Sequence, residues 1–169
     1  MDCYGDGDFA GVLGNKNPQD PICDSSRTVF LVTFDNCPLL WVSKIQTEIA
    51  LSTLHSDYVS LSHSVRALLP LKSLIKEVID NLGIDCEYLK FVSRSTVHEE
   101  NNRAIFVETS PRMTPSSKHI DVKYHWFRQH VAKEFVIQKI ESENRKSDIF
   151  TKGLQGQIFV RIRKLLCGW

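Results

Sequence analysis

The sequence predicts an α/β domain in which a mixed five-stranded sheet is flanked by helices. Short apolar runs typical of strands alternate along the chain with segments of helical periodicity, and this alternation indicates a sheet covered by helices. The length of 169 residues suits one domain of ordinary size. A composition of 42% hydrophobic and 24% charged residues excludes a disordered tail and a membrane-embedded protein.

Three strands are expected before the first helix. The first is a short strand near Cys3–Asp6, and a loop rich in Gly, Asp, Asn and Pro follows it up to residue 26. Val29–Phe34 and Leu39–Val42 are apolar runs on either side of Asp35–Pro38, which has the composition of a turn. These two runs are therefore predicted to form a hairpin.

A long helix is expected between Thr47 and Leu82. Its apolar side chains recur every three or four positions, as on one face of a helix. They are Leu54, Tyr58, Leu61, Val65, Leu68, Leu74, Ile75, Val78, Ile79 and Leu82. Pro70 is expected to kink or restart this helix, and Gly83 to terminate it.

Strands and helices continue to alternate in the second half. Strands are expected at Tyr88–His98 and Phe135–Ile140, and helices at Asn101–Thr109 and Lys118–Lys133. The last of these is expected to bury Ile120, Tyr124, Phe127 and Val131.

Two more helices are expected near the C-terminus. Ser147 is predicted to cap one that begins at Asp148, and Ile158, Ile162 and Leu165 mark a final amphipathic helix. We expect residues 1–169 to form one domain, with residues 156–169 as a C-terminal helical extension.

The first six residues lack the basic and apolar regions of a signal peptide, and no apolar run approaches the ~20 residues needed to cross a bilayer. A cytoplasmic or nuclear protein is expected. Five scattered cysteines without a C-x-x-C pair indicate free thiols. Because Met1 lies only five residues before Asp6, the chain is interpreted as a fragment of a longer reading frame.

The net charge of +1 conceals a gradient along the chain. Residues 1–60 carry eight acidic and three basic residues, whereas residues 111–169 carry five acidic and twelve basic ones. This distribution suits a cation-binding centre beside a polyanion-binding face. Ordinary surface charge is the alternative interpretation.

Acidic residues stand where expected strands end and where an expected helix begins. Asp6 and Asp8 close the first strand, Glu99 and Glu100 close the fourth, and Asp148 opens a helix, where the helix dipole favours an anion. Carboxylates converging from different elements are the ligands of hard cations such as Mg²⁺. Two metal ions ~3.5–4 Å apart would clamp the attacking and leaving oxygens of a phosphodiester. Each acid taken alone is better explained as a turn or cap residue, and only their joint placement in one sheet favours a metal site.

Six motifs carry a resemblance to a known family. In chain order they are Asp6–Gly11 (DGDFAG), Ser26–Thr28 (SRT), Trp41–Gln46 (WVSKIQ), Ala50–Thr53 (ALST), Lys118–Arg128 (KHIDVKYHWFR) and Asp148–Leu154 (DIFTKGL). In this order they resemble the ribonuclease H domain in the C-terminal part of copia-type retrotransposon Pol polyproteins, and they span nearly the whole chain.

The resemblance implies a ribonuclease H-like fold and Mg²⁺-dependent cleavage of RNA in RNA–DNA hybrids, with Mn²⁺ as an alternative metal. It implies the reverse transcriptase portion of the same polyprotein as a partner, and neither a membrane nor a small-molecule cofactor. No phosphate-binding glycine loop, G-x-S-x-G or H-E-x-x-H motif competes with this interpretation.

The family's four catalytic carboxylates can be carried over to this sequence. The first falls on Asp6, the last on Asp148, and the third on Glu100, where the family has aspartate. Asp6, Glu100 and Asp148 are thus the implied metal ligands. The extra methylene of Glu100 matters, because a displacement of ~1 Å in a positioned reaction can cost ~100-fold in rate.

The second carboxylate falls on one of two positions. If the first glutamate of the family motif is the ligand, His55 has replaced it, and histidine is a poor partner for Mg²⁺. If the second glutamate is the ligand, Asp57 keeps the carboxylate. Side chains two residues apart on a helix are rotated by ~200° and cannot point the same way.

Two functional outcomes follow from the altered carboxylates. One is a weakened ribonuclease H, in which His55→Glu with Glu100→Asp is expected to restore cleavage. The other is a catalytically inactive relic that at most binds nucleic acid.

The expected 118–133 helix also carries a polar stripe opposite its apolar face. Lys118, His125 and Arg128 belong to this stripe and are candidates for contact with hybrid backbone phosphates. A solvated face with helical salt bridges is the alternative.

Overall fold

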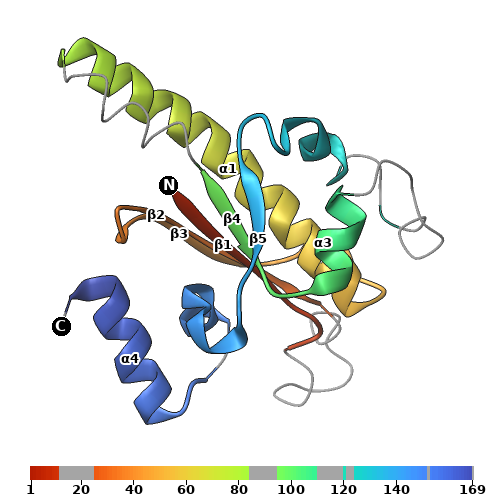
Figure 1. The fold of residues 1–169 in the computed structure, drawn as a ribbon. Coiled ribbons are helices and arrows are strands. Elements are labelled where there is room, and N and C mark those ends of the chain that lie inside the picture. The colour runs from red at the N-terminus through yellow and green to blue at the C-terminus, as the bar shows by residue number, and fades with distance from the viewer. Residues whose placement is uncertain (12–24, 84–94, 110–119, 121–123, 152, 169) are drawn as a thin grey trace.

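The computed structural model describes residues 1–11, 25–83, 95–109, 120, 124–151 and 153–168. The strands are β1 (Asp2–Asp8), β2 (Arg27–Phe34), β3 (Cys37–Ile45), β4 (Thr96–Glu99) and β5 (Val136–Lys139). They form a sheet in the order β3-β2-β1-β4-β5. β1 pairs antiparallel with β2, and β2 with β3, whereas β1/β4 and β4/β5 are parallel. The predicted mixed five-stranded sheet with helices is therefore confirmed (Figure 1). The helices are α1 (Thr53–Asn81), α3 (Asn102–Thr109) and α4 (Gly156–Cys167), with 3₁₀ turns η3 (Trp126–His130), η4 (Ser142–Asn144) and η5 (Lys146–Phe150).

The predicted hairpin is present, with a tighter turn than expected. Asp35 and Asn36 have φ angles of 47° and 63°, the two positive values that a type I′ turn requires. Cys37 and Pro38 already belong to β3. Pro38 is tolerated there because β3 is an edge strand, on which a missing N–H need not break the ladder.

Helix α1 runs without interruption from Thr53 to Asn81, so the expectation that Pro70 restarts the helix was wrong. Pro70 lies on the exposed side, and the packing of the buried side outweighs its one lost hydrogen bond. Ser52 caps the helix by accepting a hydrogen bond from the N–H of His55. Gly83 follows the helix with a φ of 63°, as its predicted terminating role requires.

The two faces of the sheet carry separate apolar clusters, because side chains alternate along a strand. Cys3, Phe30 and Val97 face α1 and α3. Tyr4 and Leu31 face the opposite side, where Ile162 and Leu166 of α4 cover them. Figure 1 shows α1 and α4 on opposite sides of the sheet.

Part of the expected 118–133 helix lies outside the described residues. Within the described residues the chain forms only the 3₁₀ turn η3 and leaves helical geometry after His130. Ala132 has a φ of 66°, and Val131 bridges to Phe135, so the predicted extension to Lys133 was wrong. Ile120, Tyr124 and Phe127 are buried as predicted, and Val131 packs partly against them.

The turn η5 and the helix α4 near the C-terminus differ in part from the prediction. Ser147 does not cap a helix at Asp148: it lies inside η5, whose N-cap residue is Arg145. Helix α4 forms as predicted, but it buries Ile162 and Leu166 and leaves Ile158 and Leu165 exposed. The buried pair is spaced four residues apart, which places both side chains over the same strip of the sheet.

Cys3, Cys37 and Cys167 are free thiols, whereas Cys23 and Cys86 lie outside the described residues, as do positions 88–94 of the strand expected at Tyr88–His98. Within the described ranges, no helix combines the length and the apolar character needed to cross a bilayer.

Helix α1 approaches β1 so closely that only glycine fits at position 7. A Cβ on Gly7 would lie 2.4 Å from the carbonyl carbon of Ser56 and 2.6 Å from the nitrogen of Asp57. The hydroxyl of Ser60 donates to the carbonyl oxygen of Asp6 (2.6 Å) and ties the same helix to the same strand. This contact fixes the start of α1 against the end of β1.

Gly7→Ala is expected to lower the free energy of unfolding by about 3 kcal/mol, because backbone cannot move aside as a flexible side chain can. Urea unfolding measures this, with Gly153→Ala as the matched control, since a Cβ there meets nothing within 4 Å. Equal stability of the two variants would contradict the close approach.

Candidate active site

A cavity of about 460 Å³ lies where β1 and β4 end beside the start of α1. β1 and β4 are parallel, and Tyr4 pairs with His98. Asp6 and Glu100, each two residues further along, therefore lie at the same end of the sheet. The cavity is lined by Asp6, Gly7, Asp8, Phe9, Thr53, Asp57, Glu100, Asn101, Arg145 and Thr151. Of the acidic side chains predicted to converge, Asp6, Asp8 and Glu100 line the cavity, whereas Glu99 and Asp148 do not.

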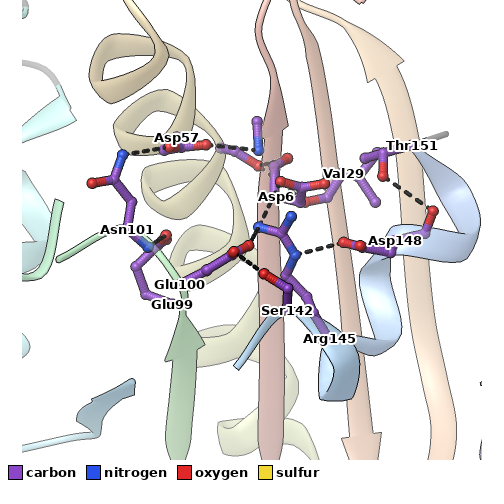
Figure 2. A network of polar contacts seen from close by, with 12 residues as sticks. Asp6, Val29, Asp57, Glu99, Glu100, Asn101, Ser142, Arg145, Asp148 and Thr151 are labelled. Carbon is purple, nitrogen blue, oxygen red and sulfur yellow. Dashed lines mark hydrogen bonds and ion pairs between the residues drawn. The ribbon is translucent and has the colours of Figure 1, made fainter. Parts of the chain in front are cut away.

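Asp6 shares the sheet face of Tyr4 and therefore points toward η5 rather than α1. On that side the guanidinium of Arg145 meets three carboxylates, as Figure 2 shows. Arg145 Nη1 lies 2.9 Å from Asp6 Oδ1 and 2.9 Å from Glu100 Oε2, and Arg145 Nε lies 2.5 Å from Asp148 Oδ1. Asp148 does not line the cavity itself but is joined to it through Arg145.

The neighbouring carboxylates stabilise the positive charge of Arg145. Burial opposes the charge, but the carboxylates of Asp6, Asp148 and Glu100 outweigh it and raise the pKa of the guanidinium. The segment around it is anchored on both sides. Lys146 Nζ donates to Asn36 Oδ1 (3.0 Å), and the hydroxyl of Ser142 donates to Glu100 Oε1.

Asp57 and His55 have different surroundings. Asp57 lines the cavity, where its Oδ1 accepts the N–H of Gly7 (3.2 Å) and its Oδ2 accepts the side-chain amide of Asn101 (2.8 Å). His55 is buried away from the cavity lining, and its Nδ1 accepts the N–H of Leu51 (3.2 Å). Of the two alternatives left open by the sequence, the geometry favours Asp57.

Glu99 is buried directly behind this group. Its Oε1 accepts the N–H of Asn101 (2.9 Å), so Asn101 connects Glu99 to Asp57. Burial, together with the charge of Asp57, raises the pKa of Glu99 to about 8. Burial likewise raises the pKa of Asp57 to about 6, assisted by Asp6 and opposed by Asn101 and Arg145.

Glu99 is expected to make the protein less stable as the pH rises. The pKa of Glu99 is higher in the folded than in the unfolded state, so the folded protein binds the proton more tightly. The stability that this proton contributes is fully present below about pH 4.5 and is lost as the pH rises through 8. Glu99→Gln should therefore match the parent at pH 5 and exceed it by about 1–3 kcal/mol at pH 9.

Urea unfolding between pH 5 and pH 9 measures this difference. Glu141→Gln, at an exposed carboxylate, is the matched control and should show no such trend. A constant difference between Glu99→Gln and the parent across this range would count against a raised pKa.

The residues proposed from sequence for phosphate contact do not join the carboxylates. Lys118 lies outside the described residues. His125 is half-buried, and its Nδ1 lies 2.8 Å from the hydroxyl of Tyr58. Burial, with Arg128 nearby, lowers the pKa of His125. Neither His125 nor Arg128 lines the cavity.

The donor chemistry of the site suits a hard divalent cation, since Asp6, Asp57 and Glu100 in the cavity and Asp148 beside it offer only carboxylate oxygens. As the side chains stand, however, no three His, Cys, Asp or Glu residues in the described part of the chain are arranged to hold a metal ion. Arg145 lies between three of the four carboxylates (Figure 2). The ligand types therefore fit a metal, and the present arrangement holds a guanidinium instead.

Sequence reasoning missed Arg145 and Asn101 as members of the site. A signal for Arg145 was its position three residues before Asp148, a spacing that allows contact within one helical turn. Asn101 directly follows Glu100 at the end of a strand, so its proximity was predictable although its contact with Asp57 was not.

No protein-family model matches the chain. Over 165 residues the chain is 29% identical to the retrovirus-related Pol polyprotein from transposon TNT 1-94 of Nicotiana tabacum. The match covers 96% of this chain and 11% of that polyprotein, so the chain spans a small part of its curated relative.

Two solved structures are similar in fold. One is the ribonuclease H1 LC11 isolated from compost, with a TM-score of 0.55 and 16% identity over 88% of this chain and 90% of that one. The other is the N-terminal ribonuclease H domain of a Mycobacterium tuberculosis protein, with a TM-score of 0.50 and 12% identity over 96% and 95% of the two chains. The chain therefore has the ribonuclease H fold and is similar over almost its whole length to a retrotransposon Pol polyprotein, as its motifs predicted.

Proposed function

We propose that this chain is the ribonuclease H domain of a copia-type retrotransposon Pol polyprotein and cleaves the RNA strand of RNA–DNA hybrids at a reduced rate. The observation that carries the proposal is the convergence of Asp6, Asp57, Glu100 and Asp148 from four segments on one end of a ribonuclease H fold. In the cell it would act in the cytoplasm or nucleus, together with the reverse transcriptase portion of the polyprotein.

These four carboxylates would hold Mg²⁺ or Mn²⁺. Bound metal would supply an activated water and would stabilise the leaving oxygen of the phosphodiester. The protein's own contribution is to position the oxygens. Gly7 N–H and the Asn101 amide orient Asp57, and Ser142 orients Glu100. Thr151 secures the η5 backbone by donating to the carbonyl oxygen of Asp148 (3.1 Å).

The reduced rate follows from two altered side-chain lengths. The resemblance implies glutamate where Asp57 stands and aspartate where Glu100 stands, so one ligand is a methylene shorter and another a methylene longer. Ligand displacements of ~1 Å are enough to cost ~100-fold in a positioned reaction. His55 contributes nothing to this loss, because it is buried away from the cavity lining.

Cleavage of a labelled RNA–DNA hybrid tests the proposal. The chain is expected to cut the RNA strand slowly in Mg²⁺ and faster in Mn²⁺, and to leave matched RNA–RNA and DNA–DNA duplexes intact. Asp148→Asn supplies the blank. Hybrid cleavage no greater than that blank in either metal would rule out the enzyme.

A catalytically inactive fold that binds nucleic acid is the alternative. The pairing of Arg145 with three carboxylates favours it, because a guanidinium in this position neutralises part of the charge that attracts a metal. Hybrid binding without cleavage, unchanged in Asp148→Asn, would support this alternative.

A further inference from the structure

Arg145 is the cationic member of an otherwise acidic site. Its side chain is 9% exposed, and the three carboxylates that it contacts come from β1, from the residue after β4 and from η5. Carboxylates brought this close repel one another when all are ionised, and a buried anion without a partner is unfavourable. The fold therefore needs a positive charge at this point, and Arg145 supplies it.

The contacts of Arg145 involve the carboxylates that a divalent cation would need. Nη1 bridges Asp6 and Glu100, which belong to different segments, and Nε engages Asp148. An oxygen that accepts a short charged hydrogen bond is a weaker metal ligand, and a guanidinium and a divalent cation repel each other at such short range. The two cations therefore compete for one position.

We propose that Arg145 is a built-in counter-cation that occupies the metal position and must leave it before Mg²⁺ or Mn²⁺ binds. The inference rests on the proposed function, since it assumes that these carboxylates take a metal. Arg145 thereby sets the metal concentration at which the site is filled, and it keeps the carboxylates together when metal is scarce.

The backbone around Arg145 allows the guanidinium to leave the carboxylates while the segment stays in place. Arg145 is an extended residue (φ −74°, ψ 103°) between η4 and η5 rather than part of either turn. The neighbouring residues are held independently of it: Lys146 by Asn36, and the carbonyl of Glu143 by Arg161. The guanidinium can withdraw by side-chain rotation while these anchors hold the segment.

Mn²⁺ binding, followed by electron paramagnetic resonance, tests the competition without relying on activity. Arg145→Met keeps a side chain of moderate length without the charge, and it is expected to bind Mn²⁺ at least about tenfold more tightly than the parent. Arg145→Lys keeps the charge and should stay within about threefold of the parent. Arg66→Met, at an arginine stacked on Trp126, is the matched control and should also stay within about threefold.

A measurement on the parent protein covers the case in which Arg145→Met folds poorly. The Arg145 Nε–Hε signal in nitrogen–proton NMR, assigned by its loss in Arg145→Lys, should shift and exchange faster with solvent as the diamagnetic ion Mg²⁺ is added.

The outcomes separate this inference from the proposed function. Equal Mn²⁺ affinity of the parent and Arg145→Met, or an Nε–Hε signal unchanged at saturating metal, would overturn the competition and leave the metal site in place. Absence of Mn²⁺ binding by both proteins up to millimolar concentrations would overturn both.

Discussion

Asp57→Asn is expected to reduce hybrid cleavage by roughly 10²–10⁴-fold, the loss that several kcal/mol of transition-state stabilisation would produce. Asparagine keeps the shape of the side chain and an oxygen for the N–H of Gly7. The variant should fold, because burial already disfavours the charge of Asp57, whose pKa is raised to about 6. Single-turnover cleavage in Mn²⁺, with urea unfolding in parallel, separates lost chemistry from lost stability.

His55→Asn is the matched control for this prediction. An asparagine oxygen can replace Nδ1 as the acceptor for the N–H of Leu51, and the backbone N–H of residue 55 can still donate to the capping hydroxyl of Ser52. Cleavage is expected to stay within about threefold of the parent. If His55→Asn lost as much activity as Asp57→Asn, the choice between the two positions would have to be reversed.

The double variant Asp57→Glu with Glu100→Asp is expected to cleave the hybrid about 10–100-fold faster than the parent. It restores both ligand lengths that the family resemblance implies, and each correction moves a carboxylate by about 1 Å. The rate gains of the two single variants, multiplied together, should be smaller than the gain of the double variant, because residues of one site couple strongly. The measurement is the single-turnover rate in Mg²⁺, where ligand geometry matters most.

The pair His55→Glu with Glu100→Asp, expected from the sequence to restore cleavage, provides the comparison. A glutamate at position 55 would bury a carboxylate away from the cavity lining and would destabilise the fold. No gain over Glu100→Asp alone is expected. A gain that depended on His55→Glu would show that the second ligand position had been misassigned.

The parts of the fold that depend on local patterns could be predicted from the sequence. The β2–β3 hairpin follows from two apolar runs around Asp35-Asn36, and α1 follows from apolar residues spaced by three and four. The carboxylates of Asp6 and Glu100 could be placed together because Asp6 lies near the end of one strand and Glu100 directly follows another strand of the same sheet. These features need only periodicity and strand order.

The features that depend on distant contacts could not be predicted. Whether His55 or Asp57 faces the cavity depends on the rotation of α1, which is fixed by its close approach to Gly7. Arg145 stands in a charged stretch that is typical of a surface, and its burial depends on β1, β4 and η5 meeting around it. Ser147 has the composition of a helix cap but lies inside η5, because the chain turns there to bring Asp148 to Arg145.

A crystal soaked in Mn²⁺ and measured for anomalous scattering would show whether the four carboxylates hold a metal ion in place of the Arg145 guanidinium. We expect an anomalous peak within reach of Asp6, Asp57, Glu100 and Asp148, with the guanidinium of Arg145 withdrawn from Asp6. This expectation would be contradicted by Arg145 still paired with Asp6 and Asp148, and no Mn²⁺ peak among the four carboxylates, at a Mn²⁺ concentration that supports hybrid cleavage.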